Sequence, residues 1–179
     1  MKLSNIIFGL IIALFICLLM GIARAETIRG KARVIDGDTI EINDKKIRLL
    51  CIDTPESKYK GKTQYCLDNE TDCGDLAKKE LKRLIDRKEV WCEYDKIDMY
   101  GRILGMCQEY SYWNTYAYWG TYNYLMIRYG YAWYYPGGKE CKPFKEAFEI
   151  AQRENLGLFD EDLGGFKDPK AWRKTRSND

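Results

Sequence analysis

The stretch TIRGKARVIDGDTIEINDKKIRLLCID, residues 27–53, alternates apolar and polar residues in three short runs separated by turns. Asp36-Gly37 separates the first run from the second, and residues 43–46 separate the second from the third. Alternation of this kind is typical of strands with one buried face, and both separators have the chemistry of hairpin turns. The stretch therefore predicts three consecutive antiparallel strands.

The rest of the chain adds one hairpin and three helical patterns. Residues 90–94 and 102–107 flank a turn and predict a second hairpin, which brings the number of strands to five. Apolar residues at helical spacing predict helices over 75–85, 121–130 and 141–157. Together these elements predict an α+β fold, a five-stranded antiparallel β-barrel of the oligonucleotide-binding (OB) type with about three helices.

The N-terminal segment has the pattern of an export signal. A lysine is followed by an apolar run at 6–22 and by Ala-Arg-Ala at 23–25, the small-x-small form that signal peptidases cleave. We expect residues 1–25 to be removed and the protein to be exported to the periplasm or the medium. The alternative is an uncleaved membrane anchor, because the apolar run of 17 residues approaches the length of a membrane span.

Cleavage after Ala25 would leave one domain and a neutral chain. We expect a domain at 26–166 and a basic, loosely held tail at 167–179. Removal of Lys2 and Arg24 leaves equal numbers of basic and acidic residues. A general basic attraction to nucleic acid is therefore excluded, and phosphate binding must come from a local arrangement of charges.

The even number of cysteines in the exported chain favours disulfides. The six are Cys51, Cys66, Cys73, Cys92, Cys107 and Cys141. Cys92 and Cys107 lie symmetrically about the predicted hairpin, which makes them cross-strand neighbours. Cys66 and Cys73 can close a short loop, and Cys51 and Cys141 pair by elimination. A zinc site is disfavoured because the chain has no histidine and no C-x-x-C motif.

Four short pieces of the chain matter together: DGDT at 36–39, RLLCIDTPE at 48–56, DMYGR at 98–102 and AQRENLGLF at 151–159. DGDT alone is a common turn, and YGR alone means little. In this order and approximate spacing the pieces resemble the thermonuclease family, the staphylococcal-nuclease-like domains, across nearly the whole mature chain. The resemblance implies an endonuclease that depends on calcium and hydrolyses phosphodiester bonds in DNA, RNA or both.

The resemblance also implies a role for each matching residue. Asp38, Asp53 and the backbone carbonyl of Thr54 would hold Ca²⁺, Glu56 would be the general base, and Arg48 and Arg102 would bind the phosphate. These roles agree with the chemistry, since a chain without histidine needs a carboxylate base and arginine suits bidentate phosphate binding. Singly, Asp38 could cap a hairpin and Arg48 could pair with Glu56 at the surface. Asp36 and Gly37 are expected to serve the turn only.

The segment at 110–136 is rich in aromatic residues, with ten tyrosines and three tryptophans. Most are expected to pack against the fold. Tyr100, Tyr134 and Tyr135 are the candidates for stacking on substrate bases. Two departures from the family pattern are Phe159, where tryptophan is common, and residues 110–120, which resemble a short insertion.

The leading hypothesis is an exported, calcium-dependent nuclease that acts as a monomer on DNA or RNA, with no obligate protein partner. One alternative is a staphylococcal-nuclease-like binding module without catalysis, and Arg48, Glu56 and Arg102 together argue against it. Another is a membrane-tethered surface protein that adheres through its aromatic residues, which depends on the N-terminal apolar segment alone.

Overall fold

The computed structural model describes residues 25–57, 60–112 and 118–176 of the chain. The predicted export signal, except for Ala25, lies outside the described residues. Within the described ranges, no helix combines the length and the apolar character that crossing a bilayer requires.

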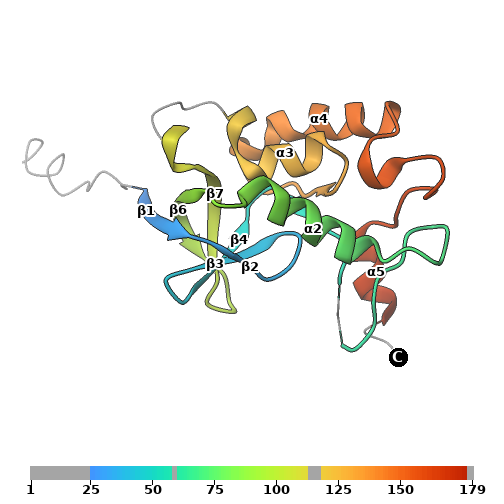
Figure 1. Cartoon of the computed structure of the whole chain (residues 1–179), viewed down its shortest axis with the longest axis horizontal. Coiled ribbons are helices and arrows are strands. Elements are labelled where there is room, and N and C mark those ends of the chain that lie inside the picture. The colour runs from blue at the N-terminus through green and yellow to red at the C-terminus, as the bar shows by residue number, and fades with distance from the viewer. Residues whose placement is uncertain (1–24, 58–59, 113–117, 177–179) are drawn as a thin grey trace, which may run out of the picture.

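Six strands form one mixed sheet in the order β1-β6-β7-β4-β3-β2. Their bounds are β1 Glu26–Lys31, β2 Arg33–Val34, β3 Thr39–Ile42, β4 Lys45–Leu49, β6 Glu89–Ile97 and β7 Ile103–Glu109. The first predicted strand is divided, because β1 pairs with β6 whereas β2 pairs with β3. The two edge strands are thus neighbours in the chain, so the sheet curls into a partly closed barrel (Figure 1).

The α+β, OB-type class is confirmed, but the main sheet has six strands rather than five and one pair differs in direction. β7 lies parallel to β4, with Ile47 opposite Ile103 and Leu49 opposite Gly105. The expectation of a wholly antiparallel sheet is therefore wrong at this pair, because β7 is inserted beside β4 in a direction that its own hairpin with β6 sets. β5 (Ile52–Asp53) and β8 (Trp133–Tyr134) form a separate antiparallel pair.

Four α-helices accompany the sheet in the described residues. They are α2 (Cys73–Ile85), α3 (Tyr122–Arg128), α4 (Lys142–Arg153) and α5 (Pro169–Arg176), and short 3₁₀ turns lie at Tyr110–Tyr112, Tyr118–Gly120, Lys139–Cys141 and Gly157–Phe159. Asp72 and Thr121 begin α2 and α3 as side-chain caps. The first three helices match the predicted ones. In Figure 1, α3 and α4 lie together, and α5 lies apart from them near the C-terminal end.

The C-terminal segment is not loosely held, contrary to expectation. Pro169 begins α5, and the Asp168 carboxylate accepts a hydrogen bond from the backbone N–H of Lys170 at 2.9 Å. The Trp172 side chain is buried against the body of the protein. A proline start, a cap and a buried tryptophan together explain why this basic segment is ordered.

Packing of the aromatic segment follows expectation for most of its described residues. Tyr122 is buried, and Tyr118, Tyr124, Tyr131 and Trp133 pack against the core. Trp119, Tyr129 and Tyr135 are more exposed. Phe159 joins a ring cluster with Trp133, Phe148 and Phe166, so it fills a packing position. Residues 113–117 of the segment lie outside the described residues.

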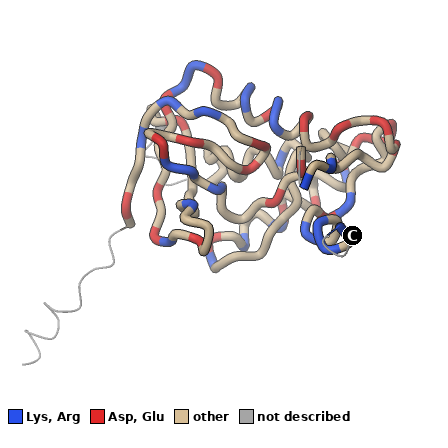
Figure 2. Tube along the Cα trace, turned by 90° about the horizontal axis from the view of Figure 1, so that it is seen from below, with Lys and Arg blue, Asp and Glu red and all other residues tan. Residues whose placement is uncertain are grey.

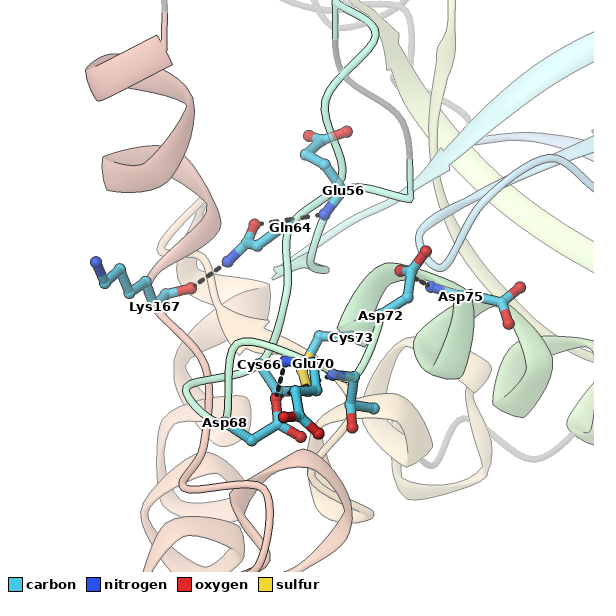
Figure 3. Close-up of a disulfide and its surroundings, with 10 residues drawn as sticks. Glu56, Gln64, Cys66, Asp68, Glu70, Asp72, Cys73, Asp75 and Lys167 are labelled. Carbon is cyan, nitrogen blue, oxygen red and sulfur yellow. Dashed lines mark hydrogen bonds between the residues drawn. A yellow bond between two sulfur atoms is a disulfide. The ribbon is translucent and has the colours of Figure 1, made fainter.

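The structure contains all three expected disulfides, Cys51–Cys141, Cys66–Cys73 and Cys92–Cys107. Cys92 and Cys107 are opposite each other in the β6–β7 register, as the hairpin symmetry predicts. Cys66–Cys73 closes the loop before α2 (Figure 3). Cys51–Cys141 joins the residue before β5 to the residue before α4 and so ties β5, which carries Asp53, to the helical layer.

Candidate active site

An open pocket of about 750 Å³ lies beside β4, the β6–β7 turn and α5. Its lining residues are Lys46, Arg48, Glu56, Asp98, Tyr100, Arg102, Leu104, Tyr135, Lys170 and Arg173. Seven of these ten residues are basic or acidic, and they come from segments far apart in the sequence. Figure 2 shows that basic residues also gather on the last helix, near the C-terminal end. The pocket is therefore a charged recess rather than an apolar ligand cavity.

The Asp36-Gly37-Asp38 turn places one carboxylate inside the protein and uses the other for the turn. The backbone N–H of Asp38 donates to Asp36 Oδ1 at 3.1 Å, as expected of a residue that serves the turn. Gly37 is required because a Cβ atom there would lie 2.7 Å from Thr54 Oγ1 and 2.9 Å from Ala77 Cβ. This close approach holds the turn against Thr54.

Asp38 is 5% exposed and accepts hydrogen bonds from Thr39 Oγ1 at 2.9 Å and from the backbone N–H of Thr54 at 3.4 Å. Burial raises the pKa of Asp38 to about 6, and Asp36 adds to the rise, while Arg48 opposes it. The carboxylate is thus costly to bury as an anion unless a cation lies beside it.

Arg48 connects the two buried aspartates. Its Nη1 lies 2.6 Å from Asp38 Oδ2, and its Nη2 lies 2.7 Å from Asp53 Oδ1. The β3–β4 register, with Thr39 opposite Arg48, brings the guanidinium to Asp38. Burial alone would lower the pKa of Arg48, but both carboxylates raise it above its ordinary value, so the side chain stays charged.

Glu56 follows β5 and is held by its backbone. Its N–H donates to Gln64 Oε1 at 3.4 Å, and Gln64 in turn donates to the carbonyl of Lys167 at 2.7 Å (Figure 3). At Gly74, in the first turn of α2, an added Cβ would lie 2.2 Å from the backbone nitrogen of Ser57. The start of α2 therefore packs directly against the Glu56–Ser57 backbone. Burial raises the pKa of the Glu56 carboxyl, against the opposing effect of Arg173.

Arg102 is oriented by the turn of the β6–β7 hairpin. Asp98 accepts hydrogen bonds from the backbone N–H groups of Tyr100 and Arg102, each at 2.9 Å, and from Arg102 Nε at 2.8 Å. The Arg102 guanidinium also lies 5.6 Å from the centre of the Tyr100 ring. One aspartate thus aims Arg102 into the pocket and leaves Tyr100, which is 77% exposed, at its rim.

The structure brings most of the predicted site residues together. Arg48, Glu56, Arg102, Tyr100 and Tyr135 line the pocket, and Asp38, Asp53 and Thr54 are buried behind Arg48. Tyr134 is the exception. It pairs with Ile52 in the β5–β8 sheet and packs against the core, so it does not line the pocket beside its neighbour Tyr135.

Arg173 and Lys170 belong to the pocket but were not predicted from the sequence. Arg173 Nη2 lies 2.5 Å from Asp53 Oδ2, and Arg173 Nη1 lies 2.5 Å from Glu56 Oε1. Lys170 Nζ lies 5.4 Å from the centre of the Tyr135 ring. The basic composition of residues 167–176 was visible in the sequence, but no local pattern indicates where that segment docks. Gln64 and Gly74 were missed for the same reason. Asp98 lies in the DMYGR piece, and its position four residues before Arg102 could have indicated their contact.

The oxygen donors in the site suit a hard cation. Asp38 and Asp53 supply carboxylates, and Thr54 adjoins both, directly in the chain and through its hydrogen bond to Asp38. Two carboxylates, a backbone carbonyl and waters are a ligand set that Ca²⁺ accepts. Within the described ranges, no cluster of three or more His, Cys, Asp or Glu side chains has metal-site spacing, so a bound cation would depend on the carbonyl and on water.

Comparison with known proteins gives one family and several relatives. Residues 46–161 match the model of the staphylococcal nuclease homologue family. The chain is 38% identical over 87 residues to the succinoglycan biosynthesis protein ExoI of Rhizobium meliloti, covering 46% of this chain and 43% of that protein. It is 36% identical over 107 residues to an uncharacterized endonuclease of Escherichia coli, covering 58% of each.

The chain thus spans about half the length of these two relatives. A longer but weaker match, 28% identical over 159 residues, is to Protein ParB of Escherichia coli, and it covers 84% of this chain and 82% of that protein. The family match includes Arg48, Glu56 and Arg102 and ends before α5.

Proposed function

The chain belongs to the staphylococcal nuclease homologue family, and from this premise we propose that it is a calcium-dependent endonuclease that hydrolyses phosphodiester bonds of DNA, RNA or both. The observation that carries the proposal is the meeting of Arg48, Glu56 and Arg102 in one pocket. These residues come from a strand, a loop and a hairpin turn, and hydrolysis needs them in one place.

In the proposed reaction, the guanidinium groups of Arg48 and Arg102 bind the scissile phosphate and stabilise the negative charge that builds on its oxygens. Glu56 accepts a proton from the attacking water as the water oxygen bonds to phosphorus, and the ester P–O bond breaks with its oxygen taking a proton from solvent to leave as an alcohol. Asp53 holds Arg48 in place through the 2.7 Å contact, and Asp98 does the same for Arg102.

Asp38, Asp53 and the Thr54 carbonyl are the residues proposed to hold Ca²⁺. Bound there, the ion would supply positive charge to phosphate oxygens and to the attacking water. The support in this structure is that burial keeps the pKa of Asp38 raised even with Arg48 beside it, so a second cation would further stabilise the anion. Tyr100 and Tyr135, at the rim of the same pocket, are proposed to contact substrate bases.

The three disulfides indicate an oxidising compartment. In keeping with this, we propose export with cleavage after Ala25, a catalytic domain at 26–166 and a monomer whose partner is its nucleic acid substrate. A binding module without catalysis is the second candidate. It is less favoured because Glu56 and both arginines are present and share the pocket.

The test compares wild type with Glu56→Gln, which keeps the shape of the side chain but cannot take the proton. Turnover of single- and double-stranded DNA and RNA, measured by gel assay with calcium, should fall by about a hundredfold or more. Binding of a nucleotide should survive. Asp38→Asn serves as the comparison, because it should weaken calcium binding and be partly rescued by additional calcium.

Two results would contradict parts of this proposal. Equal and negligible activity in wild type and both variants, with nucleic acid binding intact, would favour the binding module. A wild type that cuts equally well in the presence of chelator would keep the nuclease and remove the roles given to calcium, Asp38 and Asp53.

A further inference from the structure

The last helix places a basic side chain on two acids of the proposed catalytic machinery. α5 carries four basic residues and no acidic residue in eight positions. Its Arg173 contacts Asp53 Oδ2 and Glu56 Oε1, each at 2.5 Å, and Asp53 Oδ1 at 3.2 Å. A single guanidinium therefore engages both the carboxylate proposed to bind calcium and the carboxylate proposed to take the proton.

While Arg173 makes these contacts, it competes with calcium for Asp53 and with the attacking water for Glu56. Asp53 is 1% exposed, and its two oxygens already accept from Arg173 and, at Oδ1, from Arg48. A divalent cation would have to bind oxygens that a guanidinium occupies, next to that guanidinium's positive charge. Glu56 Oε1 is likewise engaged by Arg173, so Arg173 competes with the attacking water for this oxygen and holds the Glu56 carboxylate beside a positive charge that weakens it as a base.

The way in which α5 is held permits Arg173 to leave. The chain before the helix is anchored by the Gln64–Lys167 hydrogen bond, and the helix itself is anchored by buried Trp172. The contact with the acids, by contrast, is made by one long side chain that is 23% exposed. Rotation of that side chain, or local opening of α5, can release the acids while Gln64 still holds Lys167.

We propose that α5 is an autoinhibitory strap, in which Arg173 pairs with Asp53 and Glu56 and must leave before calcium and water take its place. The inference builds on the proposed function and adds a regulated step to it. Arg173 lies outside residues 46–161, which match the family model.

The strap predicts a measurable penalty on calcium binding. When only a fraction of a protein is competent to bind, the apparent dissociation constant rises by the reciprocal of that fraction. If the open state makes up about 10% of the molecules or fewer, Arg173→Ala should bind calcium about tenfold more tightly, or better. Arg173→Lys keeps the charge but not the bidentate contact. Its calcium affinity should lie between those of wild type and Arg173→Ala.

The experiment titrates calcium alone into the full mature chain by isothermal calorimetry, without nucleic acid. Lys174→Ala is the matched control, because it removes the same charge from an exposed position of the same helix and should leave the calcium affinity at the wild-type value. Circular dichroism and thermal melting establish that each variant is folded. In wild type, calcium should also speed hydrogen exchange of the α5 amides, and in Arg173→Ala this change should be absent.

The outcomes separate this inference from the proposed function. Tighter calcium binding by Arg173→Ala supports the strap even if no variant and no wild type cuts nucleic acid. Unchanged or weaker calcium binding, or no calcium binding by either protein, overturns the strap whether or not the wild type is a nuclease. A fall in turnover of Arg173→Ala at saturating calcium also overturns it, because Arg173 would then belong to the phosphate-binding group.

Discussion

The disulfide between Cys51 and Cys141 closes a much longer loop than the disulfide between Cys66 and Cys73, and the two should differ in how much they stabilise the protein. A cross-link restricts the unfolded chain more strongly when its loop is longer. For the separation of 90 residues in the first bridge, the loop-entropy relation gives about 4.6 kcal/mol, and for the separation of 7 in the second it gives about 2.3 kcal/mol.

Replacing both cysteines of a bridge by alanine avoids free thiols and makes the comparison clean. All four side chains are at most 2% exposed, so the packing lost on substitution is similar and largely cancels in the difference. We expect the Cys51/Cys141 double variant to lose about 2 kcal/mol more free energy of unfolding than the Cys66/Cys73 double variant. Urea denaturation without reductant, followed by circular dichroism, measures both.

The slope of the free energy with urea provides an internal check, because an unfolded chain freed from a long loop exposes more surface and should give a larger slope. The Cys66/Cys73 variant should show a smaller change in slope. An equal or larger loss of stability in the Cys66/Cys73 variant would refute the loop argument and point instead to local packing at that bridge.

Two further substitutions test the scaffold around the site. Asn123→Leu should cost about 3 kcal/mol or more in urea denaturation, because this fully buried amide accepts from Cys107 N–H and donates to the carbonyls of Leu50 and Gly105, each at 2.9 Å. A loss below about 1 kcal/mol would contradict that reason. Gly74→Ala should lower turnover by up to about a hundredfold by displacing the Glu56 backbone, whose carbonyl carbon would lie 2.4 Å from the new Cβ. Gly120→Ala is its control, since within the described part of the chain no atom beyond the adjacent residues lies within 4 Å of a Cβ there, and an equal effect of both would refute displacement as the cause.

The sequence by itself determined the features that depend on near neighbours in the chain. Strand alternation and turn residues predicted β3, β4 and the β6–β7 hairpin, and the symmetry of that hairpin predicted the Cys92–Cys107 bridge. Apolar residues at helical spacing predicted α2, α3 and α4. Arg48, Glu56 and Arg102 were proposed through the motifs that contain them, and all three line the pocket.

Only the tertiary structure decided which distant segments meet. The parallel β4–β7 pair, the placement of Tyr135 at the pocket and Tyr134 against the core, and the docking of α5 on Asp53 and Glu56 all join segments far apart in the chain. Local periodicity shows which face of a strand or helix is buried, but not which element packs against that face. The packing partner depends on how all the apolar faces are buried together. Arg173 is the clearest example. The sequence of its segment predicts only a basic tail. Arg173 becomes part of the site because the burial of Trp172 brings the Arg173 guanidinium to the two acids.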